Sequence, residues 1–323
     1  MTDWNRMTAE ASSAFGPAGF EEGIRRWVTG AVGAKLDRCE TDPFGNVLAR
    51  TWTPGAKGRV LLVAGLDQPG VLATNVDGEG RVRIAPIGPI QPRDLLGQKI
   101  RFQNGAAGLV DAEVKGEGEA VDWQSLFVLP ISGTVGIGEP GVIDPRVEIL
   151  GEIALGANLP WRAGTIVLAA LADHLAGGRY DVTLLFSAQR SVGARAGRLA
   201  AFEEAFDWAL DIGTVPVTGA PGPSKGGLRV GGGPVIRAMD RSLVVRPEMK
   251  QRLWDLAETR GIPCQAGVAP ETASDGGILA MSESGLLVGG VDIPVYKTRG
   301  NLGFLQFTDL QAALDLLRAA LET

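Results

Sequence analysis

Side chains that bind transition metals or act as nucleophiles and general bases are scarce in this sequence. It contains one histidine, His174, and two cysteines, Cys39 and Cys264. Zinc, haem and iron–sulfur sites built from these residue types need several ligands, which this chain cannot supply. A single histidine also limits hydrogen-bonded triads with a serine or cysteine nucleophile. Carboxylates are plentiful, so composition does not exclude a glycosidase that uses two of them as acid and base, although no two carboxylates stand out.

Two glycine-rich runs lack the spacing of phosphate-binding loops. Gly231–Gly233 is followed by Pro234 and not by a helix pattern, so it fails the dinucleotide fingerprint and is expected to form a turn. Gly222–Lys225 lacks the P-loop spacing and is expected to be a flexible loop. His174 lies near the end of an apolar helical segment, where we expect it to interact with the helix dipole rather than to act in catalysis.

Composition places the chain among globular proteins and excludes several partners. It has 323 residues, 45% of them apolar, and a net charge of −6 without a block of basic residues. A nucleic-acid or anionic-membrane partner is therefore not expected. Thr165–Ala172, the longest apolar stretch, is far shorter than the ~20 residues that span a bilayer. The N-terminus carries Asp3 and leads into no apolar run, so it is not a signal peptide, and we expect a cytoplasmic protein.

Strand and helix signals alternate near both ends of the chain. Short apolar runs, typical of strands buried on both faces, occur at 59–65, 181–187, 208–212 and 286–293. Helical periodicity occurs at 19–32, 163–176, 195–206 and 247–260, and a final helix begins with the capping box Thr308–Gln311. This alternation predicts an α/β fold with a mixed, largely parallel sheet sandwiched by helices.

The middle of the chain has a different pattern. From about Gln68 to Ala157, short β-like segments are broken by glycine and proline, and no convincing helix interrupts them. We therefore predict a discontinuous α/β domain, residues 1–67 and 158–323, with an inserted β-rich domain at 68–157.

Several segments resemble, in order and at fitting separations, the tetrahedral or deblocking aminopeptidases, which include glutamyl aminopeptidases and proteins labelled endoglucanases. The match covers nearly the whole chain. The segments are Gly16–Glu21 (G-P-S-G-x-E in the family), Asp42–Ala49 (D-x-x-G-N-x-x-A), Arg59–Val71 (a strand ending in H-x-D-E-x-G), Leu159–Gly164 (L-D-D-R-x-G), Ser187–Gly193 (T-x-Q-E-E-V-G), Asp211, Ser274-Asp275 (T-D) and Ile293-Pro294 (I-P-x-R-Y-x-H).

The resemblance implies a cocatalytic two-metal peptidase scaffold and a homo-oligomer. In that family the β-rich insert mediates dimer formation and the subunits form dodecamers. We therefore expect a dimer or dodecamer, with co-assembly with an active paralogue as a further possibility.

The residues that the resemblance assigns to metal binding and base catalysis are replaced in this chain. The first histidine ligand aligns with Gly65, followed by the retained Asp67 and by Gln68 in place of an acid. The other departures are Pro160 and Trp161 at the bridging carboxylate (with Arg162 retained), Arg190 and Ser191 at the glutamate pair, and Arg299 at the last histidine. Of the five expected ligands, only Asp211 remains.

Such a set does not suit hydrolysis by two metal ions. Glycine and proline offer no side-chain ligand, and arginine neither accepts a proton nor binds a cation. We therefore expect no metal and no peptidase activity. The alternative is a rebuilt hydrolase site holding a zinc or cobalt pair.

Two roles for the arginines stay open. Arg190 and Arg299 can neutralise the buried carboxylates of Asp67 and Asp211, which would otherwise be costly. Alternatively, Arg162, Arg190 and Arg299 bind a carboxylate, phosphate or peptide ligand in the old cleft. Asp275 is expected to cap a helix rather than to bind a metal.

Overall fold

The computed structural model describes residues 2–113, 120–197, 199, 204–217, 227–282, 285–297 and 302–323. Its helices are α1 (Trp4–Ser13), α2 (Glu22–Val32), α3 (Pro92–Leu95), α4 (Leu159–Leu171), α6 (Pro247–Arg260), α7 (Gly276–Ala280) and α8 (Phe307–Glu322), with 3-10 turns η1 (Ala172–His174) and η2 (Arg190–Val192). Its strands are β1 (Arg38–Thr41), β2 (Val47–Thr51), β3 (Arg59–Gly65), β4 (Gly70–Val76), β5 (Val82–Ile87), β6 (Lys99–Phe102), β7 (Ala107–Ala112), β8 (Leu126–Ser132), β9 (Pro140–Ile143), β10 (Val147–Leu150), β11 (Ile153–Gly156), β12 (Asp181–Ser187), β13 (Trp208–Val217), β14 (Val235–Asp240), β15 (Gln265–Ala269), β16 (Leu287–Lys297) and β17 (Gly303–Gln306).

The main sheet is mixed, with a parallel centre. Strands β12, β3, β13 and β16 pair in parallel, whereas β1, β2, β17, β11 and β10 extend the sheet with antiparallel pairings. β14 pairs antiparallel with β16 and carries β15 at its outer side. The predicted α/β class and mixed sheet are therefore confirmed.

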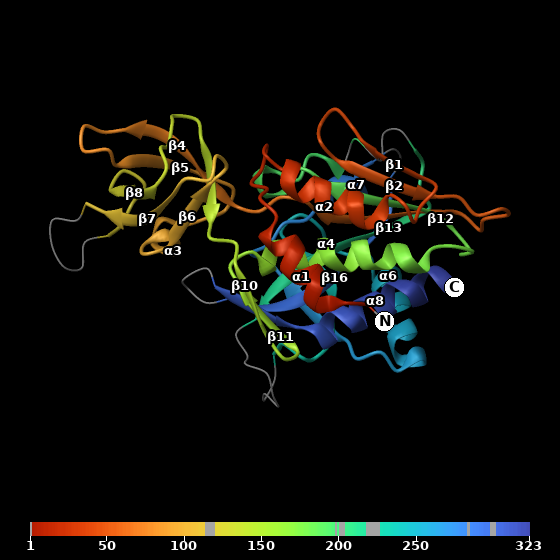
Figure 1. The fold of residues 1–323 in the computed structure, drawn as a ribbon. Helices are drawn as coiled ribbons and strands as arrows, with labels where there is room; N and C mark the ends of the chain where they lie inside the picture. The colour runs from red at the N-terminus through yellow and green to blue at the C-terminus, as the bar shows by residue number, and fades with distance from the viewer. Residues whose placement is uncertain are drawn as a thin grey trace.

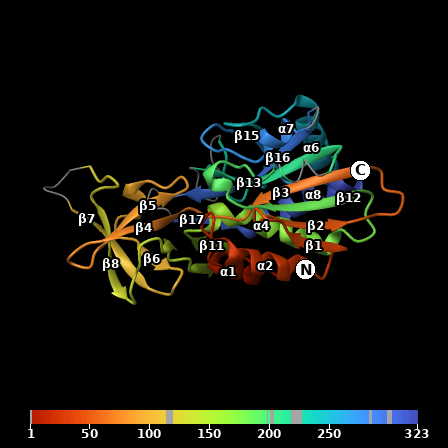
Figure 2. The ribbon, with the colours of Figure 1, turned by 90° about the horizontal axis from the view of Figure 1, so that it is seen from above.

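Helices cover both faces of this sheet, as the apolar runs predict. In β3, Val60, Leu62 and Ala64 face a core shared with α1, α2, α4, α6 and α8, whereas Leu61 and Val63 face a second core that includes Leu279 of α7. Figure 2 shows α1 and α2 on one side of the strands and α7 on the other. Because successive strand residues point to opposite faces and helices cover both faces, the residues on each face of β3 are apolar.

Six strands of the middle segment form a closed barrel, in the order β4-β5-β8-β7-β6-β9, with its own apolar core. Figure 1 shows this barrel beside the α/β body. β10 and β11 do not belong to it, because β11 pairs with β17 in the main sheet. The domain boundaries stay a prediction, and these pairings favour an insert that ends near Ile143 rather than at Ala157.

The structure confirms some of the helices and strands predicted from the sequence and adds one that was not predicted. Strands at 59–65 and 181–187 and the helix at 247–260 have the predicted bounds. Helix α1 was not predicted; its N-terminus is capped by the Asp3 carboxylate, which accepts a hydrogen bond from the Arg6 amide. Residues 198 and 200–203 of the helix expected at 195–206 lie outside the described residues, as does the loop at 222–225. Among the described helices, none has the length and apolar character that crossing a membrane requires.

The capping box predicted for the last helix is wrong. Gln306 precedes α8 without a side-chain cap, and the buried Asp309 carboxylate instead accepts hydrogen bonds from the amides of Gly231 and Gly233, both at 2.7 Å. Gly231 and Gly233 have φ values of 80° and 83°, which glycine adopts readily. The glycine run is thus a turn, as predicted, and it is fastened to α8.

This contact predicts a pH dependence of stability. Burial raises the pKa of Asp309 to about 6, above the unfolded value of about 3.9. The folded state therefore binds the proton more readily, and this stabilising effect is complete below pH ~4 and is lost as the pH rises through 6. Between pH 4 and 8 the free energy of unfolding of the wild type should therefore fall by on the order of 3 kcal/mol through this group. Asp309→Asn should reduce that fall, as measured by urea titration at several pH values in this range. Asp315→Asn, on the exposed face of α8, is the control and should keep the wild-type slope.

Candidate functional site

The predicted site residues gather where parallel strands end. Gly65 ends β3, and its parallel partner Ser187 ends β12. The segments that follow the two strands therefore begin side by side at the same edge of the sheet. Asp211 of β13 lies level with Val63 of β3 and Gly290 of β16. In open α/β sheets the crevice outside the carboxyl ends of the strands is where ligands bind. A cavity of about 620 Å³ opens here, lined by residues that include Asp67, Trp161, Arg190 and Arg237.

Arg190 lies against Asp211 at the floor of this cavity. Its Nη2 donates to Asp211 Oδ1 at 2.8 Å, and its Nη1 lies 3.4 Å from Asp275 Oδ2. The Asp211 side chain is fully buried, whereas 15% of the Arg190 side chain is exposed. Burial alone would lower the pKa of Arg190, but Asp211 and Asp275 raise it above its ordinary value. Arg190 is therefore a fixed cation at this position.

A second guanidinium, that of Arg237 from β14, lies at the centre of the cluster. It makes two contacts with Asp292, from Nε at 2.8 Å and from Nη2 at 2.5 Å. Nη2 also donates to Asp211 Oδ1 at 3.0 Å, and Nη1 donates to Asp240 Oδ2 at 2.9 Å. Burial would lower the pKa of Arg237, but Asp292 and the other carboxylates hold it well above its usual value.

Asp240 is tied to the cluster by hydroxyl groups. It accepts from Ser274 Oγ at 2.5 Å and from Ser242 Oγ at 2.7 Å. Burial alone would raise its pKa, but the Ser274 hydroxyl and Arg237 lower it. Asp240 is therefore an ionised partner of Arg237.

Asp275 stands at the predicted N-cap position of α7, but its side chain makes no cap hydrogen bond. Its Oδ2 instead accepts from Ser187 Oγ at 2.7 Å and lies 3.4 Å from Arg190 Nη1. Burial raises its pKa to about 6 against the opposing effect of Arg190. Ser274-Asp275 thus supplies two polar side chains to the cluster.

Asp67 is held by the backbone rather than by a guanidinium. Its two carboxylate oxygens accept from the amides of Arg190 and Ser191, both at 2.8 Å. Gln189, just before them, has φ 55°, and its amide donates to Glu21 at 2.9 Å. A non-glycine residue in the left-handed region costs energy that the surroundings must offset. Glu21 and Asp67 therefore set the backbone from which the Arg190 side chain extends.

The two other arginines singled out in the sequence differ in position. Arg162 is fully buried, and its Nη2 donates to Gln68 Oε1 at 2.7 Å and to the Ala14 carbonyl at 3.1 Å. Burial lowers its pKa to about 10. Its guanidinium therefore faces Gln68 and the end of α1. Arg299 lies outside the described residues.

Glycines make room for both guanidinium groups. A Cβ at Gly65 would lie 2.6 Å from Arg190 Cδ, and one at Gly290 would lie 2.8 Å from Arg237 Nε. A Cβ at Gly213 would lie 3.0 Å from Arg237 Nη2 and 3.3 Å from Arg190 Nη2. These approaches are closer than normal carbon contacts of about 3.5–4.0 Å. Three strand glycines therefore fit the two arginines.

This arrangement does not fit a pair of divalent ions. Asp211 Oδ1 already accepts from two guanidinium groups, and the stem of Arg190 fills the space beside Gly65. Pro160 lines the cavity, with its carbonyl accepting from Thr214 Oγ1 at 2.6 Å. In the described part of the chain, no three His, Cys, Asp or Glu side chains group so as to hold a metal ion.

Arg237, Asp240 and Asp292 are site residues that were not predicted from the sequence. Arg237 interrupts the apolar strand Val235–Asp240, and Asp292 stands within the apolar run 286–293. A charge inside a buried strand needs a partner, and that was the available signal.

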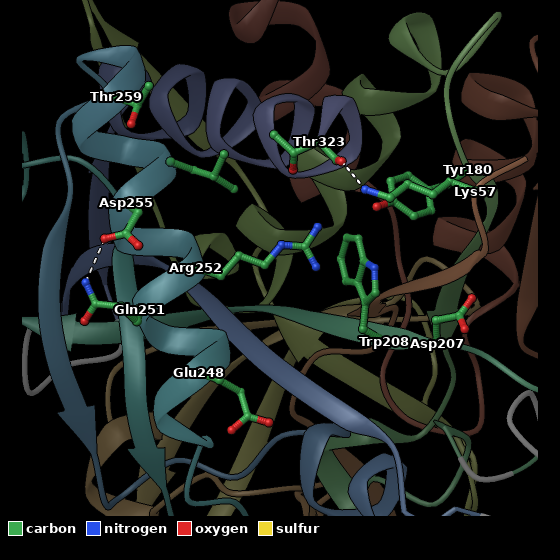
Figure 3. Close-up of a pocket in the computed structure, with 11 residues that line it drawn as sticks. Lys57, Tyr180, Asp207, Trp208, Glu248, Gln251, Arg252, Asp255, Thr259 and Thr323 are labelled. Atoms are coloured by element: carbon green, nitrogen blue, oxygen red, sulfur yellow. Dashed lines mark hydrogen bonds between the residues drawn. The ribbon is translucent and has the colours of Figure 1, made fainter.

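Figure 3 shows a second depression, at the opposite edge of the sheet, where Trp208 begins β13. Arg252 lies over the Trp208 indole with its guanidinium carbon 4.6 Å from the ring centroid, and Asp255 accepts from Gln251. Lys57 donates to the Thr323 carbonyl (Figure 3). These groups contact one another, which suits packing at the amino ends of strands rather than chemistry. Neither His174 nor the two free cysteines line either hollow.

Comparison with known proteins gives consistent results. A family model described as M42 glutamyl aminopeptidase matches residues 131–316. The lysyl aminopeptidase of Pyrococcus furiosus is 28% identical, over 100% of this chain and 97% of its own length. An aminopeptidase structure from Desulfurococcus kamchatkensis superposes with a TM-score of 0.91 at 24% identity, over 98% and 94% of the two chains. The Pyrococcus horikoshii TET1 peptidase, described as assembling into a tetrahedron or an octahedral shell, gives 0.87 at 22% identity, over 99% of each chain.

Proposed function

Because this chain belongs to the M42 glutamyl aminopeptidase family, we propose that it is a member that does not hydrolyse peptides and that serves as a structural, regulatory or binding subunit of an oligomer. The contact of Arg190 Nη2 with Asp211 Oδ1 at 2.8 Å carries this proposal. Two-metal hydrolysis needs cations that bind and acidify a water. A guanidinium supplies positive charge, but it has no open coordination position for a water.

The experiment combines metal analysis with an activity assay. The purified protein should contain no stoichiometric zinc, cobalt or manganese by mass spectrometry. It should not cleave aminoacyl-anilides when these ions are added, under conditions in which the lysyl aminopeptidase of Pyrococcus furiosus is tested in parallel. Bound metal together with turnover would instead establish the alternative, a hydrolase with a rebuilt site.

The oligomeric role has support on the barrel surface. Leu109 of β7 lies opposite Leu129 of β8, and Ile131 follows two residues later, where the register of the β7–β8 pair shifts. They are 43%, 50% and 62% exposed. Exposed apolar patches of this kind mark interaction sites. We propose that this barrel face contributes to a homo-oligomer, a dimer or a dodecamer, or to assembly with an active paralogue. Light scattering on the pure chain should give a mass above that of the monomer.

Binding of a small carboxylate or peptide is the second candidate. Arg241 and Lys297 line the cavity, and within the described ranges neither side chain forms a hydrogen bond or an ion pair with a carboxylate. Apolar walls from Trp161, Ile212 and Val295 accompany them. Pockets with mostly apolar walls and a few charged groups suit small ligands.

This candidate predicts a ligand-dependent shift in thermal stability. A small carboxylate or a short peptide should raise the Tm in proportion to the logarithm of its concentration once binding is saturated. Arg241→Ala should reduce this shift, whereas Arg246→Ala, which removes an exposed arginine paired with Glu248, should not. Equal shifts in the wild type and in Arg241→Ala would contradict the assignment.

A further inference from the structure

The Arg190 side chain lies in its site much as a bound ligand would. Its stem runs along the space left by Gly65, where a Cβ would lie 2.6 Å from Cδ and 3.5 Å from Cγ. Its guanidinium lies between Asp211 Oδ1 at 2.8 Å and Asp275 Oδ2 at 3.4 Å. The 15% of its side chain that is exposed faces the cavity. Solvent can therefore reach the place that this side chain fills.

The surrounding charges depend on this group. Asp211, Asp240, Asp275 and Asp292 lie around the floor, and without Arg190 the described cluster keeps only Arg237 to balance them. Asp211 Oδ2 and Asp275 Oδ1 are buried and have no hydrogen-bond partner. A floor with this excess of buried carboxylate attracts a cation strongly.

The backbone of the site is held independently of the Arg190 side chain. The amides of Arg190 and Ser191 donate to Asp67, the Gln189 amide donates to Glu21, and the Ala188 amide donates to Asn46 at 2.8 Å. The two contacts of Arg237 with Asp292 do not involve Arg190. Removal of the side chain beyond Cβ should therefore leave the pocket standing.

We infer that the cavity floor is a preformed receptor for one monoalkyl guanidinium group, which Arg190 fills from within the chain and which takes the same group from solution once that side chain is removed. A guanidinium presents several donors in one plane, and this suits two carboxylates at fixed positions better than a spherical ion does. Arg190 uses Nη2 for a hydrogen bond to Asp211, whereas its Nη1 forms an ion pair with Asp275 at 3.4 Å without a hydrogen bond. The inference concerns the floor on which the proposed function rests, but it does not require that function.

The test is chemical rescue of Arg190→Ala. This substitution removes Cγ, Cδ and the guanidinium, which together correspond to ethylguanidine. Millimolar ethylguanidinium should raise the Tm of Arg190→Ala by several degrees with saturable dependence, and it should leave the Tm of the wild type unchanged. Arg246→Ala, which removes an exposed arginine that is paired with Glu248 and does not line the cavity, is the control and should show no rescue.

Three outcomes would overturn the inference. One is a rise in Tm that is equal with ethylammonium or magnesium at matched ionic strength, because charge alone would then suffice. Another is a lack of response of Arg190→Ala to ethylguanidinium. The third outcome concerns Arg190→Lys, which keeps the positive charge but loses the planar guanidinium. This variant should be less stable than the wild type. Equal stability would show that the site does not select for guanidinium, and this test remains valid even if Arg190→Ala does not fold. A failed rescue in a protein without peptidase activity leaves the proposed function standing, whereas peptidase turnover contradicts that function and not the receptor.

Discussion

Replacing Arg237 with methionine is expected to lower the free energy of unfolding by about 3–5 kcal/mol, the range for removing one partner of a buried ion pair. Arg237 contacts Asp211, Asp240 and Asp292, and only 3% of its side chain is exposed. Methionine fills much of the volume but leaves these carboxylates with less compensation. Urea denaturation monitored by tryptophan fluorescence measures the change.

The same variant should be more sensitive to pH than the wild type. Carboxylates that lose a buried cation bind protons more readily in the folded state than in the unfolded state. The stability deficit of Arg237→Met should therefore be larger at pH 8 than at pH 5. Arg241→Met is the control, because surface substitutions usually change stability by no more than about 0.5 kcal/mol. A loss below about 1 kcal/mol for Arg237→Met would show that the cluster is not electrostatically dependent on this residue.

The second large effect is expected at Gly65. Gly65→Ala should destabilise the protein by about 1–3 kcal/mol, because overpacking forces side chains and backbone to shift. The new Cβ would lie 2.6 Å from Arg190 Cδ and 3.3 Å from Arg190 Cβ, so the side chain could not keep its path to Asp211.

A double-mutant cycle separates this clash from a general effect of alanine in the strand. In the Arg190→Ala background, Gly65→Ala meets no side chain beyond Cβ and should cost less than in the wild type, with a coupling energy of about 0.5–3 kcal/mol. Denaturation of the four proteins gives that coupling. Gly30→Ala, in helix α2 with nothing within 4 Å of the new Cβ, should instead stabilise the protein by about 0.5–1 kcal/mol and shows the substitution without a clash. Additive effects at positions 65 and 190 would contradict the proposed fit between them.

The fold was largely predictable because its central strands are apolar on both faces. Runs such as 59–65 and 181–187 fall in the middle of the sheet, where both faces of a strand are covered and near-continuous apolar runs are typical. The pairing of β11 with β17 was not predictable, because the short β11 segment gives no local signal that its partner lies about 150 residues later in the chain. Helix α1 was missed for a similar reason: its apolar face is short and packs against α4 and β10.

The sequence predicted the character of the candidate site only at positions where the residue type by itself rules out metal binding. Arginine at 190 and glycine at 65 argued against a metal site, and the structure places the two side by side. The partners of Arg190 were not predictable, because Asp211 and Asp275 lie far from it in the chain, and Asp275 has the local pattern of a helix cap. Arg237 was missed because an arginine in a strand is more often on the surface.

Residue chemistry alone determined that this chain has a single histidine and that it builds a helix-covered sheet with a β-rich segment. Both conclusions depend on residue type and periodicity, which need no knowledge of distant contacts. Only the tertiary structure decided how the remaining charges are compensated. Two guanidinium groups share one oxygen of Asp211, and strand glycines give them space. A buried charge is stabilised by the groups around it, and folding brings these together from strands that are separated in the sequence.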